Sequence, residues 1–223
     1  MHRLHNEPKT SNGPQTTGTT LPGSTHYDVF SDLLGMGVNG RNSRMVIELA
    51  KIKPGDSVLD VACGTGSLTL TALSYTGASG KVYGIDASPG MIEVARRKVS
   101  RSAPQVNFQV GLAEKLDFPD ASFEAVISRL AIHHLPDDLK GRAFVEILRV
   151  LKPGGRLMIV DFNPPSNPIL AHLASALAGH KMMMSSNVSG LPALLSEAGY
   201  TDVSSGPTAS AFLAFVCGRK PGS

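Results

Sequence analysis

Two carboxylates in this chain stand in short apolar runs where the backbone can meet a ligand. Asp60 lies within residues 58–66 (VLDVACGTG), a run that enters a glycine-rich turn. Glycines let the backbone approach a ligand closely, and the N-terminus of the helix expected after the turn offers unpaired N–H groups. A carboxylate just before such a turn suits a ligand with an ammonium group better than a pyrophosphate. The alternative is a turn with a purely structural role.

The same turn departs from the dinucleotide-binding fingerprint, because Thr69 occupies the place of its third glycine. Asp86 ends the next apolar run, 26 residues after Asp60. An acid at the tip of a second strand can accept hydrogen bonds from both hydroxyls of a ribose. The alternative role of Asp86 is to cap the helix that follows.

A pair of histidines, His133 and His134, lies in residues 128–137 (SRLAIHHLPD), after a further apolar run. The carboxyl ends of parallel strands face the ligand crevice, so this segment is expected to line a reaction site. Imidazole titrates near neutral pH, so either residue can act as a base or position a substrate. The alternative is a histidine that only caps or packs the loop. Neighbouring side chains of an extended chain point to opposite sides, so we expect only one, His133, to face the site.

The elements that must position these residues alternate between short apolar runs and stretches of helical periodicity. This alternation predicts parallel strands joined by right-handed crossovers, in an α/β fold. Two short helices are expected before the sheet. The predicted strands span 57–62, 81–86, 106–110, 123–128, 156–161, 202–205 and 211–217. The predicted later helices span 68–75, 89–102, 139–151, 168–180 and 191–198.

The composition predicts one globular domain in 223 residues, since 42% are hydrophobic and 17% charged. A net charge of +3 is too balanced to indicate nucleic-acid binding. The two distant cysteines indicate neither a disulfide framework nor a metal site, and no apolar run is long enough to span a bilayer. A soluble, cytoplasmic protein is therefore expected. Residues 1–24 are expected to form a flexible tail, because they contain few large apolar side chains.

Taken together, these motifs resemble those of class I S-adenosylmethionine-dependent methyltransferases, through most of residues 27–219. The run 58–66 resembles the first motif of that family, and 111–116 with 118–123 resembles the segment beside adenine. Residues 148–155, ending LKPGG, are similar to the helix and turn before the fifth strand. The subgroup that the chain resembles most is the ubiquinone and menaquinone biosynthesis methyltransferases with their small-molecule relatives.

This resemblance implies a Rossmann-like, seven-stranded, mainly parallel sheet with helices on both faces and an antiparallel last strand. It implies a domain over 25–223, in which helices within 25–51 form a lid. It also implies S-adenosylmethionine as cofactor and a small-molecule acceptor whose O, N, S or C nucleophile takes the methyl group by in-line displacement. No nucleic acid, membrane or metal partner is implied, and a homodimer is an open alternative.

Position by position, the resemblance implies that Asp60 lies near the methionine ammonium and that Asp86 holds the ribose. Met91 would lie by the adenine face, and the backbone N–H of Ala113 would bond an adenine nitrogen. Tyr27 resembles an N-terminal aromatic residue that closes over the cofactor, with helix packing as its alternative. The full set of expected cofactor-binding residues is Tyr27, Asp60, Ala62, Gly64, Thr65, Gly66, Asp86, Ala87, Met91, Gly111, Leu112, Ala113, Ser128 and Arg129.

Leu112 departs from the family pattern, which commonly places Asp there to accept the adenine amino group. Glu114 is an alternative acceptor, because two residues along an extended chain lie on the same face. The quinone-biosynthesis enzymes carry an Arg-Asn-containing loop where this chain has His133 and His134, so a quinone acceptor is not indicated. Two other functions remain: an NAD(P)-dependent oxidoreductase on a similar sheet, and a protein that binds S-adenosylmethionine without catalysis.

Overall fold

The structure is a computed structural model that describes residues 14, 16, 40–99, 105–163, 188–210 and 212–222. Seven strands in these ranges form one sheet, in the order β3-β2-β1-β4-β5-β7-β6. Strands β1 to β5 are parallel, and β7 is antiparallel to both of its neighbours. The predicted fold class is therefore confirmed. The strands are β1 (Ser57–Val61), β2 (Lys81–Asp86), β3 (Val106–Val110), β4 (Phe123–Arg129), β5 (Leu151–Phe162), β6 (Thr201–Pro207) and β7 (Leu213–Arg219).

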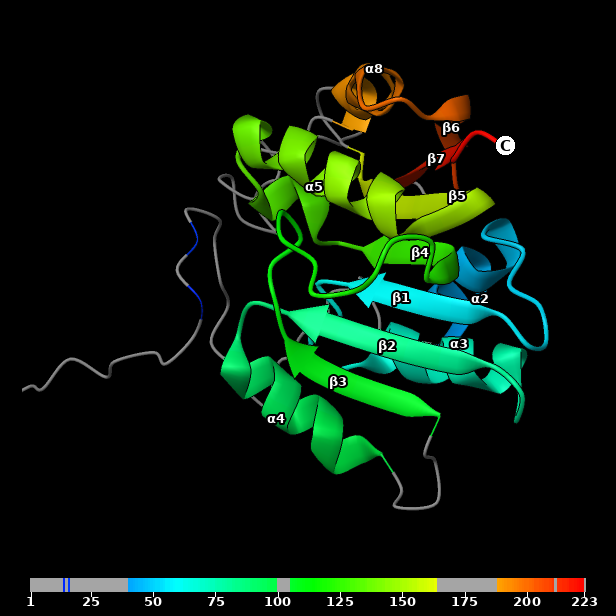
Figure 1. Cartoon of the computed structure of the whole chain (residues 1–223), viewed down its shortest axis with the longest axis vertical. Helices are drawn as coiled ribbons and strands as arrows, with labels where there is room; N and C mark the ends of the chain where they lie inside the picture. Colours follow the sequence, from blue (N-terminus) through cyan, green and yellow to red (C-terminus); the bar gives the residue numbers. More distant parts are fainter. Residues whose placement is uncertain are drawn as a thin grey trace, which may run out of the picture.

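Helices cover both faces of this sheet, and Figure 1 shows α5 in front of it with α2 and α3 behind. On one face Val46 of α2 and Leu68 of α3 pack in a core with Val58 of β1. On the other face Phe144 of α5 and Leu195 of α8 belong to a second buried core. The helices are α2 (Gly40–Leu49), α3 (Ser67–Thr76), α4 (Pro89–Lys98), α5 (Asp137–Val150) and α8 (Leu191–Glu197), with 3₁₀ turns η1 (Ile132–His134) and η2 (Val188–Gly190).

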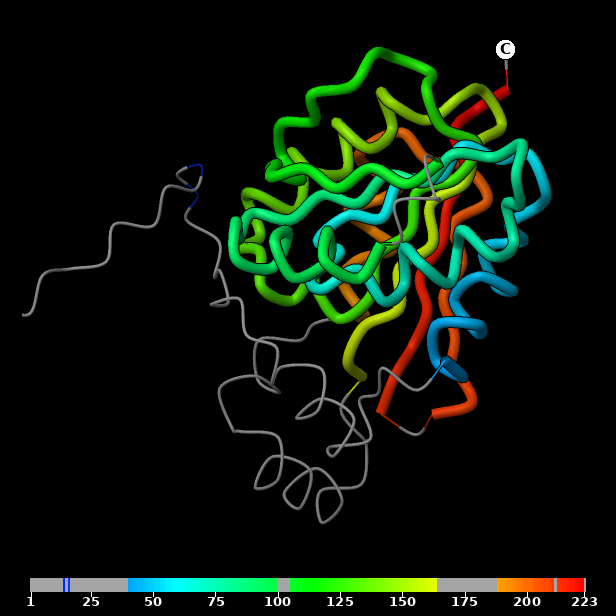
Figure 2. Tube along the Cα trace, turned by 90° about the horizontal axis from the view of Figure 1, so that it is seen from below, coloured from blue at the N-terminus to red at the C-terminus, as the bar shows by residue number. Residues whose placement is uncertain are grey.

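Helix α2 packs in one core with the C-terminal half of the sheet. Its Val46 and Ile47 are fully buried in the same cluster as Met158 of β5 and Leu213 of β7. Figure 2 shows the blue trace of α2 beside the orange and red C-terminal strands. Apart from residues 14 and 16, the expected tail lies outside the described residues, as do most of the expected lid over 25–51, Tyr27 and the predicted helix 168–180. Within the described ranges, no helix has the length and apolarity to cross a membrane.

Two predicted boundaries were wrong by four or five residues, whereas the other predicted boundaries within the described ranges lie within two residues of those in the structure. Helix α4 starts as expected, because Ser88 caps it by accepting from the Met91 N–H and Pro89 occupies its first turn. It ends at Lys98 rather than at 102, with Val99 extended and Arg96 donating two bonds to the Phe108 carbonyl of β3. Strand β5 begins at Leu151 instead of 156, because this segment already pairs with the start of β4.

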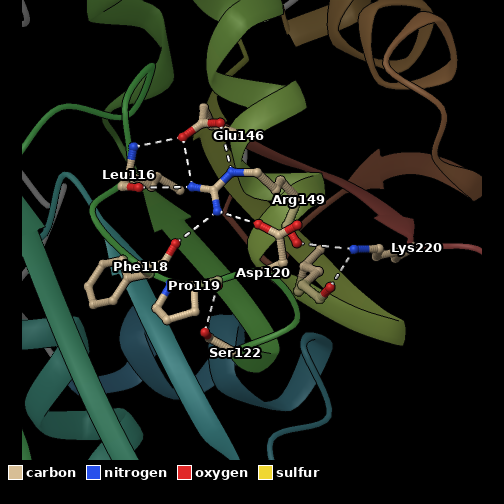
Figure 3. A network of polar contacts seen from close by, with 9 residues as sticks. Leu116, Phe118, Pro119, Asp120, Ser122, Glu146, Arg149 and Lys220 are labelled. Carbon is tan, nitrogen blue, oxygen red and sulfur yellow. Dashed lines mark hydrogen bonds and ion pairs between the residues drawn. The ribbon is translucent and has the colours of Figure 1, made fainter.

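Arg149 of α5 holds the long connection between β3 and β4 against the helix (Figure 3). Its guanidinium donates to the carbonyls of Leu116 at 2.9 Å and Phe118 at 2.8 Å, and to Asp120 at 2.7 Å. Glu146 accepts from Arg149 Nε at 2.9 Å and also from the Leu116 N–H at 2.9 Å. A planar fork with five donors matches this set of acceptors. The network thereby fixes the segment that follows β3.

We predict that Arg149→Lys lowers the free energy of unfolding by about 1–3 kcal/mol, because an ammonium cannot reach all the acceptors and leaves carbonyls unpaired. Urea unfolding followed by circular dichroism measures the change. Arg97→Lys is the matched control, since Arg97 makes an exposed pair with Glu93 on α4, and we expect a change of about 0–0.5 kcal/mol. Equal losses in the two variants would show that the network does not hold the segment.

Candidate active site

The site lies where the strand order reverses, between β1 and β4. The loop after β1 leads toward β2 on one side, and β4 lies on the other side of β1. Figure 1 shows the arrowheads of β1, β2 and β3 at one edge of the sheet. In open α/β sheets this reversal leaves a crevice beyond the carboxyl ends of the strands. The segments after β1 to β5 contain most of the predicted site residues.

Asp60 of β1 is 1% exposed, and its Oδ2 accepts a 2.6 Å hydrogen bond from the Thr69 hydroxyl of α3. Thr69 is the residue that replaces the third glycine of the dinucleotide fingerprint. Burial raises the pKa of Asp60 to about 7, although the Thr69 hydrogen bond and the nearby Arg129 charge oppose this rise. The side chain is thus a carboxyl group whose ionised form is only partly compensated.

The two glycines of the turn have different reasons to be glycine. A Cβ built on Gly66 would lie 2.6 Å from Cζ of Phe108, so Gly66 permits α3 and β3 to pack closely. Among the described residues, no atom lies within 4 Å of a Cβ built on Gly64, so there is room above its peptide. Both residues have positive φ, as does Ala62 at 56°. The turn therefore presents its backbone to open space at Gly64.

Asp86 at the end of β2 connects three loops. Its Oδ2 accepts from the Gly64 N–H at 2.9 Å, and its Oδ1 accepts from the Ser88 N–H at 2.8 Å. Its carbonyl accepts from the Gly111 N–H at 3.0 Å. Burial raises the pKa of Asp86, and the two backbone hydrogen bonds oppose that rise. The carboxylate therefore orders the glycine turn and the start of α4, and it keeps further lone pairs on both oxygens.

The segment after β3 is a turn, so the argument from an extended chain at Leu112 and Glu114 was wrong. Leu112 forms a single antiparallel bridge with Lys115, whose N–H donates to the Leu112 carbonyl at 3.3 Å. Residues two apart in such a turn do not share a face. Glu114 accepts a 3.0 Å hydrogen bond from the hydroxyl of Thr16, and Ala113 packs against the α5 side of the core.

Ser128 and Arg129 end β4 and differ in surroundings. The Ser128 hydroxyl is fully buried and donates to the Val61 carbonyl of β1 at 2.9 Å. Arg129 is partly exposed, and its charge acts on Asp60. Ser128 thus connects β4 to β1, whereas the Arg129 guanidinium adds positive charge beside the carboxyl group of β1.

His133 and His134 lie in η1, which corrects the expectation of an extended loop. Their ring centroids are 4.0 Å apart, so the rings share one side of the turn instead of pointing to opposite sides. His133 Nδ1 lies 2.6 Å from Oδ1 of Asp161, at the end of β5. Burial, followed by the neighbouring His133, lowers the pKa of His134 to about 4, against a smaller opposing effect of Asp161.

Asp161 was not among the predicted site residues, although the sequence carries a signal for it. It closes the apolar run 157–160 (LMIV), just as Asp60 and Asp86 follow apolar runs on β1 and β2. Thr65 is buried in the turn after β1, Met91 is buried in the first turn of α4, and Ala87 is partly buried after β2. Within the described ranges, no cluster of three or more His, Cys, Asp or Glu residues could hold a metal ion.

Comparison with known proteins matches residues 58–155 to a family described as "Methyltransferase domain". The chain is 40% identical over 147 residues to the ubiquinone/menaquinone biosynthesis C-methyltransferase UbiE of Ectopseudomonas mendocina, covering 65% of this chain and 57% of that protein. It is 38% identical over 142 residues to the demethylmenaquinone methyltransferase of Symbiobacterium thermophilum, covering 63% of this chain and 56% of that protein. The chain thus spans less than two thirds of the length of these relatives.

Solved structures share the fold. A methyltransferase from Aquifex aeolicus, described as SAM dependent, superposes with a TM-score of 0.67 at 21% identity, over 86% of this chain and 98% of that one. A phosphoethanolamine N-methyltransferase 2 from Haemonchus contortus, in complex with S-adenosyl-L-methionine, gives 0.66 at 19% identity, over 88% and 58%. The glycine turn and the two acids at strand ends fit the same kind of protein as these matches. Residues 58–155 therefore match a methyltransferase domain, and the chain is similar in sequence to the ubiquinone and menaquinone C-methyltransferases.

Proposed function

We propose that this protein is an enzyme that transfers the methyl group of S-adenosylmethionine to a small-molecule acceptor and releases S-adenosylhomocysteine. The observation that carries the proposal is the cradle beside the reversal of strand order. Its backbone is open above Gly64, and the two acids Asp60 and Asp86 flank it. Both acids have raised pKa values because burial disfavours their charged forms, and a ligand rich in donors and positive charge would relieve this cost.

The residues of the cradle fit S-adenosylmethionine in type. The Asp60 carboxylate would attract the methionine ammonium, and the free lone pairs of Asp86 would accept from the ribose hydroxyls. Met91 and Leu112 would give apolar contact to the adenine ring, with the Gly111 and Ala113 backbone nearby. When bound, the group supplies an electrophilic methyl on a sulfonium sulfur. The remaining work of the chain is to align the acceptor with that methyl and to exclude water.

The alternatives make different demands on this site. The dinucleotide fingerprint of an NAD(P)-dependent oxidoreductase has a third glycine for close packing of the helix on the strand, and here Thr69 stands in its place and bonds Asp60. The methyltransferase match over 58–155 supports the same choice. A protein that only binds S-adenosylmethionine is distinguished by turnover, because it forms no S-adenosylhomocysteine in the presence of an acceptor.

A cytoplasmic location and a homodimer remain predictions. The free thiols of Cys63 and Cys217 support a reducing compartment. The relatives are named as quinone C-methyltransferases. A quinone acceptor is not part of this proposal, because the loop after β4 carries two histidines where the quinone enzymes carry an Arg-Asn-containing loop.

We predict that Gly64→Ala weakens binding of S-adenosylhomocysteine at least about tenfold, a loss of about 1.4 kcal/mol, because the methyl group enters the space above the turn. Isothermal titration calorimetry measures the dissociation constant. The left-handed backbone at Gly64 will also cost about 1–2 kcal/mol of stability.

The matched control is Gly154→Ala, because Gly154 also has positive φ and no atom within 4 Å of a built Cβ, but lies at the opposite end of β5. Gly154→Ala should lose a similar free energy of unfolding but keep its affinity for S-adenosylhomocysteine. Gly66→Ala should unfold most readily, because its Cβ meets Phe108. Unchanged affinity in a folded Gly64→Ala protein would exclude this turn as the cofactor cradle.

We also predict that binding of S-adenosylhomocysteine releases a proton near pH 6–7. Asp60 has a pKa of about 7 and is largely protonated below it, whereas the ligand ammonium favours the ionised form. Affinity should therefore rise with pH up to about 7, by roughly tenfold per unit at most, and level off above. Calorimetry in phosphate and in Tris, which differ in heat of ionisation, counts the protons.

Asp60→Asn should remove this pH dependence. Thr69→Val should move its midpoint upward, because the hydroxyl that favours the charged carboxylate is lost. If the wild-type protein binds with equal affinity at pH 5.5 and 7.5, Asp60 does not face the ammonium group.

A further inference from the structure

His133 and Asp161 form a buried pair at the carboxyl ends of β4 and β5. Their side chains are 2% and 1% exposed. Asp161 Oδ1 accepts from His133 Nδ1 at 2.6 Å and from the Phe162 N–H at 2.8 Å. Its Oδ2 accepts from the His133 N–H at 3.0 Å. The carboxylate therefore holds both the backbone and the ring of His133.

These bonds decide which ring nitrogen carries the proton. An ionised carboxylate only accepts, so the proton of a neutral imidazole must sit on Nδ1. Nε2 then carries a free lone pair. Among the described residues this atom is buried and has no hydrogen-bond partner. Buried polar atoms in native proteins are rarely left unpaired, which is a reason to expect a ligand there.

His134 and Phe162 are the other rings beside His133. The Phe162 ring lies edge-on with its centroid at 5.2 Å, and the His134 centroid lies at 4.0 Å. The lowered pKa of His134 keeps its ring uncharged near pH 7 and makes it a weak base. Within the described ranges, the titratable groups beside His133 are therefore Asp161 and a neutral His134.

The pair sits at the same edge of the sheet as the cofactor cradle. Strand β4 lies between β1 and β5, with Ile127 beside Asp60 and Arg129 beside Val160. The charge of Arg129 reaches Asp60, and His133 follows Arg129 by one short turn. An acceptor held over the end of β4 would lie between His133 and a group bound above Gly64.

We propose that Nε2 of His133 is the general base of the methyl transfer, that Asp161 positions it, and that the acceptor is a hydroxyl compound. This inference rests on the proposed function. A neutral hydroxyl is the nucleophile that needs such a base most, because attack without proton removal would leave a strongly acidic oxonium. A thiol ionises near neutral pH by itself, and a free amine attacks through its own lone pair.

The acceptor oxygen forms a bond to the methyl carbon while the carbon–sulfur bond breaks and its electron pair stays on sulfur. The hydroxyl proton passes to Nε2. The imidazolium that forms is stabilised by the Asp161 carboxylate, and the proton then leaves to solvent.

The tautomer of His133 tests the proposal without any acceptor. Long-range ¹⁵N–¹H correlation spectra of the ¹⁵N-histidine-labelled protein should show Nδ1 protonated and Nε2 unprotonated at pH 7.5. His133→Asn assigns the signals. A proton on Nε2 at that pH would overturn the proposal, because the base would be absent.

Turnover provides the second test, with phenol, catechol, thiophenol and aniline as matched acceptors and S-adenosylhomocysteine as the product measured. His133→Asn is the key variant, since the amide places an N–H where Nδ1–H stands and keeps the bond to Asp161 while removing Nε2. We expect phenol or catechol turnover to fall by about 10²–10⁴-fold, with affinity for S-adenosylhomocysteine within about twofold. In the wild-type protein kcat should rise with pH, because the base must be unprotonated to act, and this rise should be absent in His133→Asn. His134→Asn is the control and should keep that pH profile.

The outcomes separate the two proposals. If His133→Asn keeps the turnover and pH profile of the wild type, His133 is not the base. If the protein methylates aniline or thiophenol but neither hydroxyl compound, the acceptor class is wrong. A protein that binds S-adenosylhomocysteine and methylates none of the four would also contradict a hydroxyl acceptor. A protein that does not bind S-adenosylhomocysteine would instead contradict the proposed function.

Discussion

Parallel pairing of β1 with β2 on one side and β4 on the other is the constraint on which the site depends. Because all three strands point the same way, their carboxyl ends meet at one edge. The chain leaves β1 through α3 on one face of the sheet and reaches β5 through α5 on the other. The loops after β1 and β4 therefore diverge, and the space between them is the crevice that the glycine turn and η1 border.

Three acids end strands at this edge, and each is used differently. Asp60 receives one hydroxyl, Asp86 receives two backbone N–H groups from different loops, and Asp161 receives a ring and two backbone N–H groups. The same residue type at equivalent positions thus yields a carboxyl group with a pKa of about 7, an organiser of loops, and a partner that orients a histidine. Burial makes each charge costly, and the cost is reduced only where a donor is near.

Strong periodicity explains why the sheet was predictable. Helices lie between successive parallel strands except between β3 and β4, and the predicted boundaries of β2 and β3 agree with the structure. Predictions went wrong where local pattern competes with distant contacts. Strand β5 is longer because its first residue, Leu151, pairs with Phe123 of β4, and α4 is shorter because Val99 is extended. The side-chain directions at Leu112 and His133 were wrong because both segments turn.

The sequence by itself determined the order of the elements, the glycine turn after β1 and the acids at strand ends, since these follow from residue type and local spacing. Tertiary structure alone decided what each residue contacts. Only packing reveals that Gly66 must admit Phe108 while Gly64 faces open space, and that Ser128 bonds β1. Only strand order brings His133 to Asp161, 28 residues later. These contacts depend on distances between segments far apart in the chain, which local spacing does not contain.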